Sequence, residues 1–340
     1  MLRLLGIVLA VLSALVAAVL TWPSLFRVDQ LFPVAQIVAF RSVLLVIMGA
    51  VALVALLLAL ARPLRLFALS IALIAAIALG ANALTLVSRG LGTDSLPEKT
   101  ADAIRVMTWN TAGSATSPES VAQIAVAMDA DIVTLPETTI ETGEAVALAM
   151  RDLGHRMWAH HAEFGEDGWD ARSTTLLISP DLGDYAVIES SVEGTTNTST
   201  VPSAVAMPVD GDGPTVVAAH AVAPRQQYMG RWRDDLSWLA DQCGQGENVI
   251  LAGDFNATID HMGRLGVDGG TLGHCHDVAS ETGNGSVGTW PTKLPGLLGA
   301  PIDHVMSSED WVPTGSIVLR SLDGSGSDHR PLIVQLEPAG

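Results

Sequence analysis

The sequence is poor in charged residues, in aromatic residues and in several catalytic motifs. Charged residues make up 16 % of its 340 residues, hydrophobic residues 49 % and aromatic residues 5 %, with a mean hydropathy of +0.39. Such a chain is too apolar to be disordered or to be an ordinary soluble protein. It has no Cys/His cluster with zinc spacing, no glycine-rich phosphate loop and no Gly-x-Ser-x-Gly elbow. Zinc-finger, P-loop and serine-hydrolase chemistry are therefore excluded.

Acidic and basic residues are separated along the chain. Residues 1–92 hold six arginines and one acid, a formal charge of +5, whereas the remainder holds 12 basic and 35 acidic residues, a charge of −23. An acidic domain repels polyanions unless a local groove is basic, so we expect no broad binding of nucleic acid. The excess of arginine over lysine, 16 to 2, and the many alanines suggest a bacterial genome.

Three long runs without charge occupy the first 90 residues. A helix needs about 20 apolar residues to cross a bilayer. The runs predict a membrane domain over 1–88, with transmembrane helices at about 4–24, 42–61 and 66–87. A buried core helix is the alternative for any one run, and the first could instead be a cleaved signal peptide.

The arginines predict which side of the membrane the rest of the chain occupies. The link 62–65 is short and basic, which favours the cytoplasm and places everything after residue 88 outside. Arg27 and Arg41 weaken this prediction because they flank a loop that would then be external. Removal of the first segment would not change the result. Residues 89–103 contain Gly, Pro, Ser and charges without an apolar period, so we interpret them as a linker.

From residue 104 short β-rich runs alternate with helical stretches. We expect helices at 118–128, 141–153 and 226–241. Expected strands lie at 104–109, 131–135, 174–179, 185–190, 204–209, 215–220, 248–252, 302–307, 316–320 and 332–336. Many strands and few helices in about 235 residues predict two packed sheets flanked by helices.

Polar residues follow several of the expected strands, where α/β proteins gather their sites. These residues are Asn110, Glu137, His220, Asp254, Asn256, Asp303, Asp328 and His329. Carboxylate and amide oxygens are the ligands that Mg²⁺ or Mn²⁺ prefers, and the neighbouring histidines can contact phosphate or move a proton. Taken singly, each residue could equally be a turn former, a cap or a satisfied core side chain.

Six short motifs in order resemble one known family. They are "VMTWN" (106–110), "DIVTLPET" (131–138), "VVAAH" (216–220), "LAGDFNAT" (251–258), "IDHVM" (302–306) and "GSDHRPLIVQL" (326–336). Together they resemble the endonuclease/exonuclease/phosphatase superfamily, whose members include pancreatic-type deoxyribonuclease, sphingomyelinases and inositol polyphosphate 5-phosphatases. The resemblance covers 104–337 and implies a four-layer α/β sandwich, two packed mostly antiparallel sheets flanked by helices, that hydrolyses a phosphoester with a divalent metal, Mg²⁺ or Mn²⁺.

The resemblance also implies roles for single residues. Glu137 would bind the metal, with Asn110 and Asp328 completing or supporting the site. Asp254 would orient and deprotonate the attacking water. Asn256 would hydrogen-bond a phosphoryl oxygen, and His220 would contact the same phosphate and stabilise the transition state. His329 would lie against the scissile phosphate, oriented by Asp303.

Other histidines and the cysteines lie outside these motifs. His304 is expected on the strand face opposite to Asp303, and His160, His161 and His261 in loops. Cys243 and Cys275, 32 residues apart, could form a disulfide in an external domain or remain buried free thiols.

Three arginines follow His220: Arg225, Arg231 and Arg233. They would either form a small anion-binding patch beside that histidine or solvate the outer face of a helix.

These observations predict a multi-pass membrane protein with an extracytoplasmic phosphoesterase domain. Its partners would be the lipid bilayer and a phosphoester substrate, which could be a phospholipid headgroup, a small organic phosphate or nucleic acid; no protein partner is predicted. An extracellular nuclease of the same fold is the nearest alternative. A membrane-anchored binding or scaffold protein with an inactive site is the other.

Overall fold

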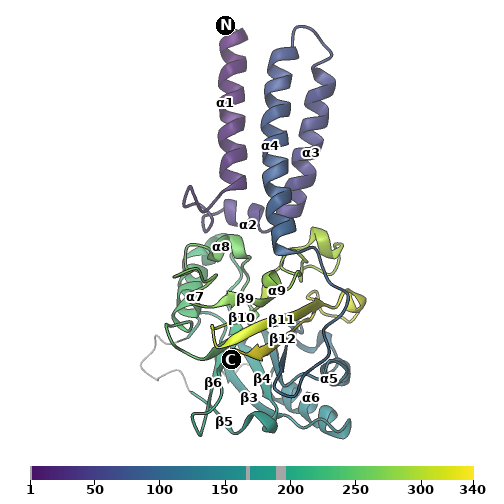
Figure 1. The fold of residues 1–340 in the computed structure, drawn as a ribbon, viewed down its shortest axis with the longest axis vertical. Coiled ribbons are helices and arrows are strands. Elements are labelled where there is room, and N and C mark those ends of the chain that lie inside the picture. Colours follow the sequence, from purple (N-terminus) through teal and green to yellow (C-terminus); the bar gives the residue numbers. More distant parts are fainter. Residues whose placement is uncertain (1, 166–168, 189–196) are drawn as a thin grey trace. The chain divides into compact units, whose positions relative to one another are not determined.

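The computed structural model describes residues 2–165, 169–188 and 197–340, and its contacts divide the chain into two units (Figure 1). The first unit is Met1–Ser88 and the second is Arg89–Gly340.

The first unit consists of helices joined by short connections. These are α1 (Leu2–Thr21), α2 (Val34–Val38), α3 (Arg41–Leu58) and α4 (Arg65–Arg89). Three of them, over Arg3–Thr21, Arg41–Leu58 and Arg65–Arg89, are long and apolar enough to cross a membrane. They expose large apolar side chains, such as Leu66 at 83 %. Water would disfavour such a surface, whereas hydrocarbon would not.

A polar contact joins the three long helices at one end. The Arg41 guanidinium donates to Oδ1 of Asn82 at 2.6 Å and to the Thr21 carbonyl at 3.3 Å. The Asn82 amide in turn donates to Oγ1 of Thr21 at 3.2 Å. The side chains of Arg41 and Asn82 are both buried, so the charge of Arg41 is occupied inside this unit.

The second unit is a sandwich of two six-stranded sheets. The first sheet has the order β11-β12-β1-β2-β4-β3 and the second has the order β5-β6-β7-β8-β10-β9. The first contains β1 (Ile104–Thr108), β2 (Ile132–Pro136), β3 (Trp158–Glu163), β4 (Ser173–Ile178), β11 (Trp311–Val318) and β12 (Leu332–Pro338). The second contains β5 (Tyr185–Val187), β6 (Ala204–Pro208), β7 (Thr215–His220), β8 (Val249–Asp254), β9 (His276–Asp277) and β10 (Asp303–Ser307).

Each sheet has one parallel pair of strands at its centre. This pair is β1–β2 in the first sheet and β7–β8 in the second, and all other pairs are antiparallel. Between the sheets lies a core of branched and small side chains, including Val106, Ile132, Val216 and Ile250. The prediction of two packed, mostly antiparallel sheets is therefore confirmed.

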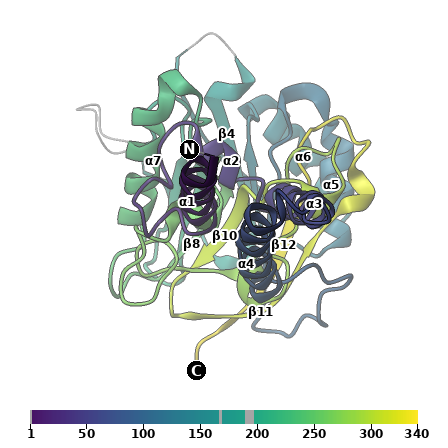
Figure 2. The same ribbon diagram turned by 90° about the horizontal axis from the view of Figure 1, so that it is seen from above.

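Helices cover the outer faces of both sheets, with α5 (Pro118–Ala127) and α6 (Ile140–Asp152) on one side and α7 (Met229–Asp241) on the other (Figure 2). Ser117 and Thr139 cap the first two helices, because their side chains accept the backbone N–H three residues later. Helix α7 buries Trp232, Leu236 and Leu239 against its sheet. Short helices α8 (Ile259–Met262) and α9 (Val278–Glu281) lie between β8 and β10 in the chain.

Residues 89–103, predicted as a linker, have no strand and are bound along the sandwich; we call them the strap. Gly92 donates its N–H to the Gly283 carbonyl at 2.9 Å, and the Thr93 hydroxyl donates to the Ser316 carbonyl at 2.6 Å. Toward the other end of the strap, Lys99 Nζ lies 2.8 Å from a carboxylate oxygen of Asp131. The strap therefore belongs to the second unit by its contacts.

Three histidines lie in regular structure, so the prediction that they are loop residues was wrong. His160 and His161 lie on β3, whose sequence WAHHAE has no β-branched residue to indicate a strand. His261 is on α8, where its Nδ1 accepts the N–H of Thr258 at 2.8 Å. His304 is on β10 as predicted, and its side chain is buried.

Candidate active site

The predicted site residues lie at one end of the sandwich because of the strand directions. Strands β1 and β2 are parallel, as are β7 and β8, so their carboxyl ends point the same way within each sheet. His220 and Asp254 end β7 and β8 and face each other in register, and Asp303 pairs with Asp254 from the antiparallel strand β10. The side chain of Asn110 then joins the two sheets at this end, through a hydrogen bond to Asp254.

Asn110 bridges two carboxylates. Its Nδ2 lies 3.1 Å from Oε1 of Glu137 and 3.1 Å from Oδ2 of Asp254. Glu137 directly follows β2 with a φ of 56°, a left-handed conformation that is uncommon for a residue with a side chain. Such backbone strain persists where the surroundings fix it, and it clusters at functional sites.

Asp254 is held by several donors at the centre of the site. The backbone N–H of Asn256 donates to its Oδ1 at 2.8 Å, and the Asn256 side-chain amide lies 3.2 Å from its Oδ2. Burial and the negative charge of Asp303 raise the pKa of Asp254 to about 7. A carboxylate with such a pKa is suited to accept a proton near neutral pH.

His329 and Asp303 form a buried carboxylate–histidine pair. Nδ1 of His329 lies 2.8 Å from Oδ2 of Asp303, and its Nε2 lies 3.9 Å from Oδ2 of Asp254. Burial alone would lower the pKa of His329, but the charges of Asp303 and Asp254 and the hydrogen bond to Asp303 outweigh it and raise that pKa to about 10. The raised pKa favours the imidazolium form of His329 at neutral pH.

His220 has the opposite electrostatic character. Burial and the neighbouring charge of His329 lower the pKa of His220 to about 3, so its ring is neutral. Its Nδ1 lies 3.4 Å from the Thr174 hydroxyl, and its backbone N–H donates to Oγ of Ser203 at 2.9 Å. His220 thus supplies a hydrogen-bonding dipole, whereas His329 supplies a positive charge.

Asp328, which was expected to share a metal with Glu137 and Asn110, is hydrogen-bonded to a tryptophan side chain. Its side chain is exposed, and Oδ2 accepts the indole N–H of Trp290 at 2.8 Å. In the described residues, Glu137 is hydrogen-bonded to Asn110, and neither is hydrogen-bonded to Asp328. Asp328 still acts on the site electrostatically, since its charge contributes to the raised pKa of His329.

The site fits a divalent cation. One ligand atom each of Asp254, Asp303 and His329 lies within 4.8 Å of the others. In the described part of the chain, Oδ1 of Asp303 is buried and accepts no hydrogen bond, and Glu137 adds a further carboxylate through Asn110. Carboxylate oxygens crowded together in this way repel one another, and a hard cation relieves that repulsion.

Residues that the sequence motifs did not assign complete the support of the site. Ser327 Oγ donates to the Asn110 carbonyl at 2.6 Å and accepts the N–H of His329 at 2.9 Å, so it joins β1 to the loop before β12. The fully buried Arg330 donates to the carbonyls of Gly288, Pro291, Thr292 and Leu294. The only sequence signal for both was their place beside Asp328 and His329.

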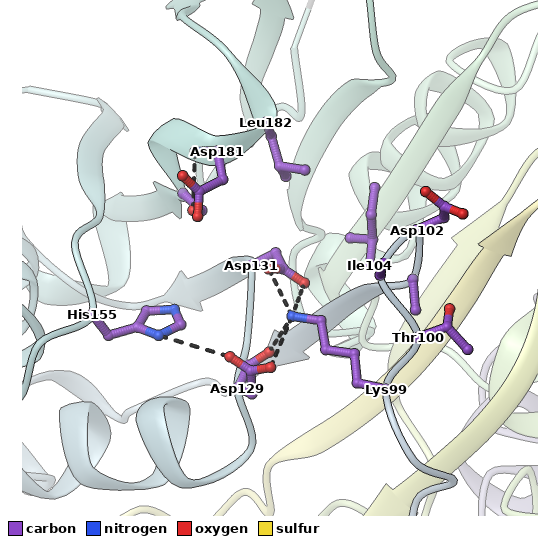
Figure 3. Close-up of a pocket in the computed structure, with 12 residues that line it drawn as sticks. Lys99, Thr100, Asp102, Ile104, Asp129, Asp131, His155, Asp181 and Leu182 are labelled. Atoms are coloured by element: carbon purple, nitrogen blue, oxygen red, sulfur yellow. Dashed lines mark hydrogen bonds and ion pairs between the residues drawn. The ribbon is translucent and has the colours of Figure 1, made fainter.

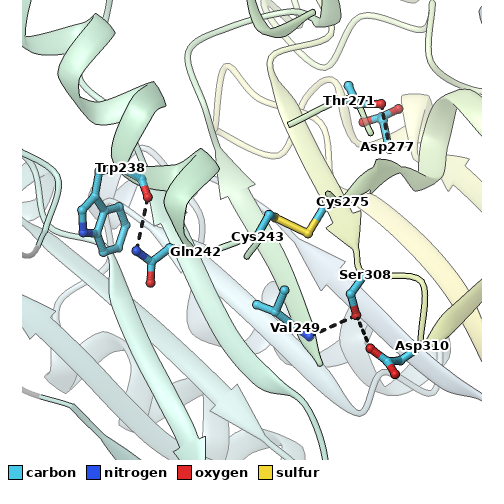
Figure 4. The surroundings of a disulfide bond; sticks show 9 residues. All are labelled: Trp238, Gln242, Cys243, Val249, Thr271, Cys275, Asp277, Ser308 and Asp310. Atoms are coloured by element: carbon cyan, nitrogen blue, oxygen red, sulfur yellow. Dashed lines mark hydrogen bonds between the residues drawn. A yellow bond between two sulfur atoms is a disulfide. The ribbon is translucent and has the colours of Figure 1, made fainter. Parts of the chain in front are cut away.

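A disulfide joins the end of α7 to the start of β9. Cys243, after α7, and Cys275, before β9, are bonded with their Cα atoms 5.5 Å apart (Figure 4). The next strand, β9, ends at Asp277, whose carboxylate lies 2.7 Å from Nδ1 of the buried His304. Nε2 of His304 contacts the carbonyl of Ala257, directly after Asn256, at 2.9 Å. The chain that follows Cys275 is therefore linked, through Asp277 and His304, to the loop that holds Asn256.

A pocket of about 570 Å³ lies at the opposite end of the sandwich, where β1 and β2 begin (Figure 3). Lys99 from the strap enters it, with Nζ 3.1 Å from Asp129 and 2.8 Å from Asp131, and His155 lies beside Asp129 (Figure 3). Lys99 neutralises the two carboxylates, so the charged groups of this pocket have a structural explanation. The pocket is separate from the candidate active site.

The Endonuclease/Exonuclease/phosphatase family model matches residues 107–329, and the chain belongs to this family. No curated protein matches the sequence.

Solved structures show the same fold at low sequence identity. An endonuclease/exonuclease/phosphatase from Beutenbergia cavernae is 18 % identical over 70 % of this chain and 72 % of its own, with a TM-score of 0.54. A humanized D. rerio TDP2 is 15 % identical over 70 % and 100 %, with a TM-score of 0.52. D. rerio TDP2 complexed with single strand DNA product is 15 % identical over 69 % and 99 %, with a TM-score of 0.50. At these identities the likeness establishes the fold.

Proposed function

We propose that the chain is a divalent-metal-dependent phosphoesterase, tethered to the membrane by α1, α3 and α4, with its catalytic unit outside the cytoplasm. The observation that carries the proposal is the buried cluster of Asp254, Asp303 and His329, joined through Asn110 to Glu137. Hydrolysis of a phosphoester needs a base for water, positive charge at the phosphoryl oxygens and a metal ligand, and this cluster contains all three.

Each role follows from protonation and position. Asp254 would accept the proton of the attacking water, since its carboxylate is oriented by Asn256 and its pKa lies near neutrality. His329 would donate to a phosphoryl oxygen as an imidazolium, oriented by Asp303. His220 and the Asn256 amide would contact the same phosphate.

Glu137 and Asn110 would hold Mg²⁺ or Mn²⁺, supported by Asp328. When bound, the cation supplies Lewis-acid stabilisation of negative charge on the phosphate. Glu137, Asn110 and Asp328 all offer hard oxygen ligands, which favour these metals over zinc or copper.

Removal of divalent metal should abolish hydrolysis of bis-p-nitrophenyl phosphate by the full-length protein. The reason is that Glu137 and Asn110 provide no positive charge of their own. The measurement is release of p-nitrophenolate in excess chelator and after titration with Mg²⁺, Mn²⁺ or Ca²⁺. Full activity in chelator would contradict the proposal. Glu137→Gln should weaken the apparent affinity for Mg²⁺, whereas Glu144→Gln, on α6, should leave it unchanged.

The proposed location rests on the helices and on the arginines. The short basic link at 62–65 favours the cytoplasm, and an odd number of spans then leaves Arg89–Gly340 outside. Arg27 and Arg41 weaken this prediction as charges beside an external loop, and Arg27 is exposed there. Arg41 is a different case. Its hydrogen bonds to Asn82 and Thr21 bury that charge within the helical unit, so it no longer counts as a loop charge.

Protein alkylated in intact cells and purified without reductant should contain the Cys243–Cys275 disulfide, because disulfides persist in oxidising compartments. Mass spectrometry of non-reduced peptides measures it, and two alkylated thiols would contradict an external domain. The variant Cys243→Ser/Cys275→Ser should lose about 3–4 kcal/mol of unfolding free energy, as expected for a loop of this length. Comparison of urea unfolding with and without reductant provides the control.

An extracellular nuclease is the second candidate function, because D. rerio TDP2, which shares the fold, was determined with a single strand DNA product. The formal charge of −23 on residues 93–340 disfavours nucleic acid as the substrate. A panel of single-stranded DNA, sphingomyelin, inositol phosphates and bis-p-nitrophenyl phosphate distinguishes the two.

A further inference from the structure

We propose that the buried pair of His304 and Asp277 positions the loop that carries Asn256, and that the reaction depends on this pair although neither residue touches the substrate. The inference rests on the proposed phosphoesterase function, in which Asn256 contacts the phosphate and orients Asp254. Neither His304 nor Asp277 has a role in the sequence-based assignment of the site, so the pair adds two positioning residues to it.

His304 contacts the loop on both sides of Asn256. Its Nε2 lies 2.9 Å from the carbonyl oxygen of Ala257, and its ring packs edge-to-face on the ring of Phe255, with the ring centres 5.4 Å apart. Phe255 and Ala257 are fully buried. Asn256 lies between them with a φ of 47°, a left-handed conformation that is uncommon for a residue with a side chain. The two contacts therefore hold the backbone that flanks this conformation.

The position of Asn256 controls Asp254 as well as the phosphate contact. The backbone N–H of Asn256 donates to Oδ1 of Asp254 at 2.8 Å. Its side-chain amide donates to the Ala221 carbonyl at 2.9 Å and lies 3.2 Å from Oδ2 of Asp254. A misplacement of about 1 Å in a reacting geometry can cost about 100-fold in rate. A small shift of this loop should therefore reduce turnover.

Asp277 fixes the orientation of the His304 ring. Its Oδ2 lies 2.7 Å from Nδ1 of His304, and its Oδ1 accepts the N–H of Ser280 at 2.7 Å, which caps α9. The side chains of His304 and Asp277 are 2 % and 0 % exposed. A carboxylate and a carbonyl are both acceptors, so this bonding pattern assigns an N–H to each ring nitrogen. Rotation of the ring would leave buried polar groups without partners, which is costly.

Strand β10 separates this pair from the catalytic one. Successive side chains of a strand point to opposite faces, so Asp303 pairs with His329 on one face and His304 pairs with Asp277 on the other. The cross-strand partner of His304 on β8 is a glycine, Gly253, whose missing side chain leaves the ring room to lie beside the loop that follows β8. One strand thus orients both His329 and the loop of Asn256.

Three variants test the hydrogen bonds of the pair. His304→Gln has one donor and one acceptor, so donation to Ala257 places its oxygen opposite the Asp277 carboxylate. We expect kcat for bis-p-nitrophenyl phosphate to fall about 10-fold to 100-fold, the range for loss of an outer partner of a site. Asp277→Asn should stay near the wild-type rate, because its amide can donate to Nδ1 of a neutral His304. The double variant should recover most of the rate, because the glutamine oxygen then accepts from the asparagine amide.

Two readouts separate positioning from general loss of stability. His304→Gln should leave the half-saturating concentration of Mg²⁺ unchanged, because Glu137 and Asn110 are not altered. Val216→Ala is the control: it removes buried methyl groups from the core between the sheets, so it should lower the urea midpoint of unfolding but leave kcat unchanged. A fall in kcat for Val216→Ala as large as that for His304→Gln would overturn the inference.

Hydrogen–deuterium exchange tests the same contacts without turnover. The full-length protein in nanodiscs is labelled, and exchange is measured at the amides of Phe255, Asn256 and Thr258. We expect about tenfold faster exchange in His304→Gln, the effect of one lost buried hydrogen bond, and wild-type exchange in the double variant.

Unchanged exchange in His304→Gln would overturn the inference, as would a double variant as impaired as His304→Gln. Faster exchange of the loop with an unchanged kcat would also overturn it, because turnover would then not depend on the position of the loop. If the wild-type protein hydrolyses no phosphoester while His304→Gln still frees the loop, the proposed function fails and the positioning of the loop by His304 stands.

Discussion

His329→Ala should lower kcat/KM for phosphoester hydrolysis by about a thousandfold, the upper range for loss of one preorganised donor. His329 is the cationic group of the site, with its Nε2 3.9 Å from Asp254, and alanine removes both the charge and the donor. The measurement is initial rates with bis-p-nitrophenyl phosphate at saturating Mg²⁺. His155→Ala, at the opposite end of the sandwich, is the matched control and should retain activity. Loss of less than tenfold for His329→Ala would remove it from the proposed mechanism.

A double-mutant cycle separates orientation from independent action. Asp303 lies 2.8 Å from Nδ1 of His329, so Asp303→Asn should misplace a histidine that is still present. We expect a large loss, smaller than that of His329→Ala, and no additional loss in the double variant. Additive losses would mean that the two residues act separately and would make Asp303 a direct metal ligand.

The same site should be held at a cost to stability. Burial and Asp303 raise the pKa of Asp254 in the folded protein, so the charged form is disfavoured there compared with the unfolded chain at neutral pH. In chelator, Asp254→Asn should therefore leave the urea midpoint of unfolding unchanged or raise it. With metal restored, the same variant should not hydrolyse the substrate. A lower midpoint would show that Asp254 has a structural role instead.

Deletion of the strap should lower the free energy of unfolding of the second unit. A fragment that begins at Ile104 should unfold with about 2–4 kcal/mol less free energy than one that begins at Arg89, because buried polar groups lose their partners. Asn284, 2 % exposed, loses the Thr93 hydroxyl, and Asp131 loses Lys99. The measurement is urea unfolding of the two fragments followed by circular dichroism.

Two single variants separate strap docking from fragment length. Lys99→Met should reproduce part of the loss, since it removes the ion pair with Asp131. Gly315→Ala should do so from the sheet side, because a Cβ at Gly315 would clash with the Pro97 ring. Glu119→Gln, at the exposed start of α5, is the control. Equal midpoints for both fragments would show that the strap contributes nothing.

The sequence predicted most of the fold because local patterns set it. Short β-rich runs predicted the strands, and the polar residues after them, such as Asn110 and Glu137, indicated the site. Prediction failed where an element was short or carried no β-branched residues, as at His160 on β3. It also could not find Trp290 against Asp328, or Arg330 bound to four carbonyls, because these contacts join loops that are fixed only by the complete sandwich.

The assignment of protonation states likewise needed the structure. Two histidines in similar motifs, His220 and His329, have pKa values displaced in opposite directions. The difference arises from Asp303, which pairs with only one of them across 26 residues of chain. No pattern in the sequence distinguishes the two rings.

The two sheets repeat one pattern of strand pairing, with a single parallel pair at the centre of each. One sheet contributes Asn110 and Glu137, and the other contributes His220 and Asp254. A ligand bound among these residues would therefore contact both sheets and resist their sliding past one another. Substrate and metal should for this reason raise the force needed to shear the two sheets apart. One sheet folded alone would lack half of these residues and should not catalyse hydrolysis.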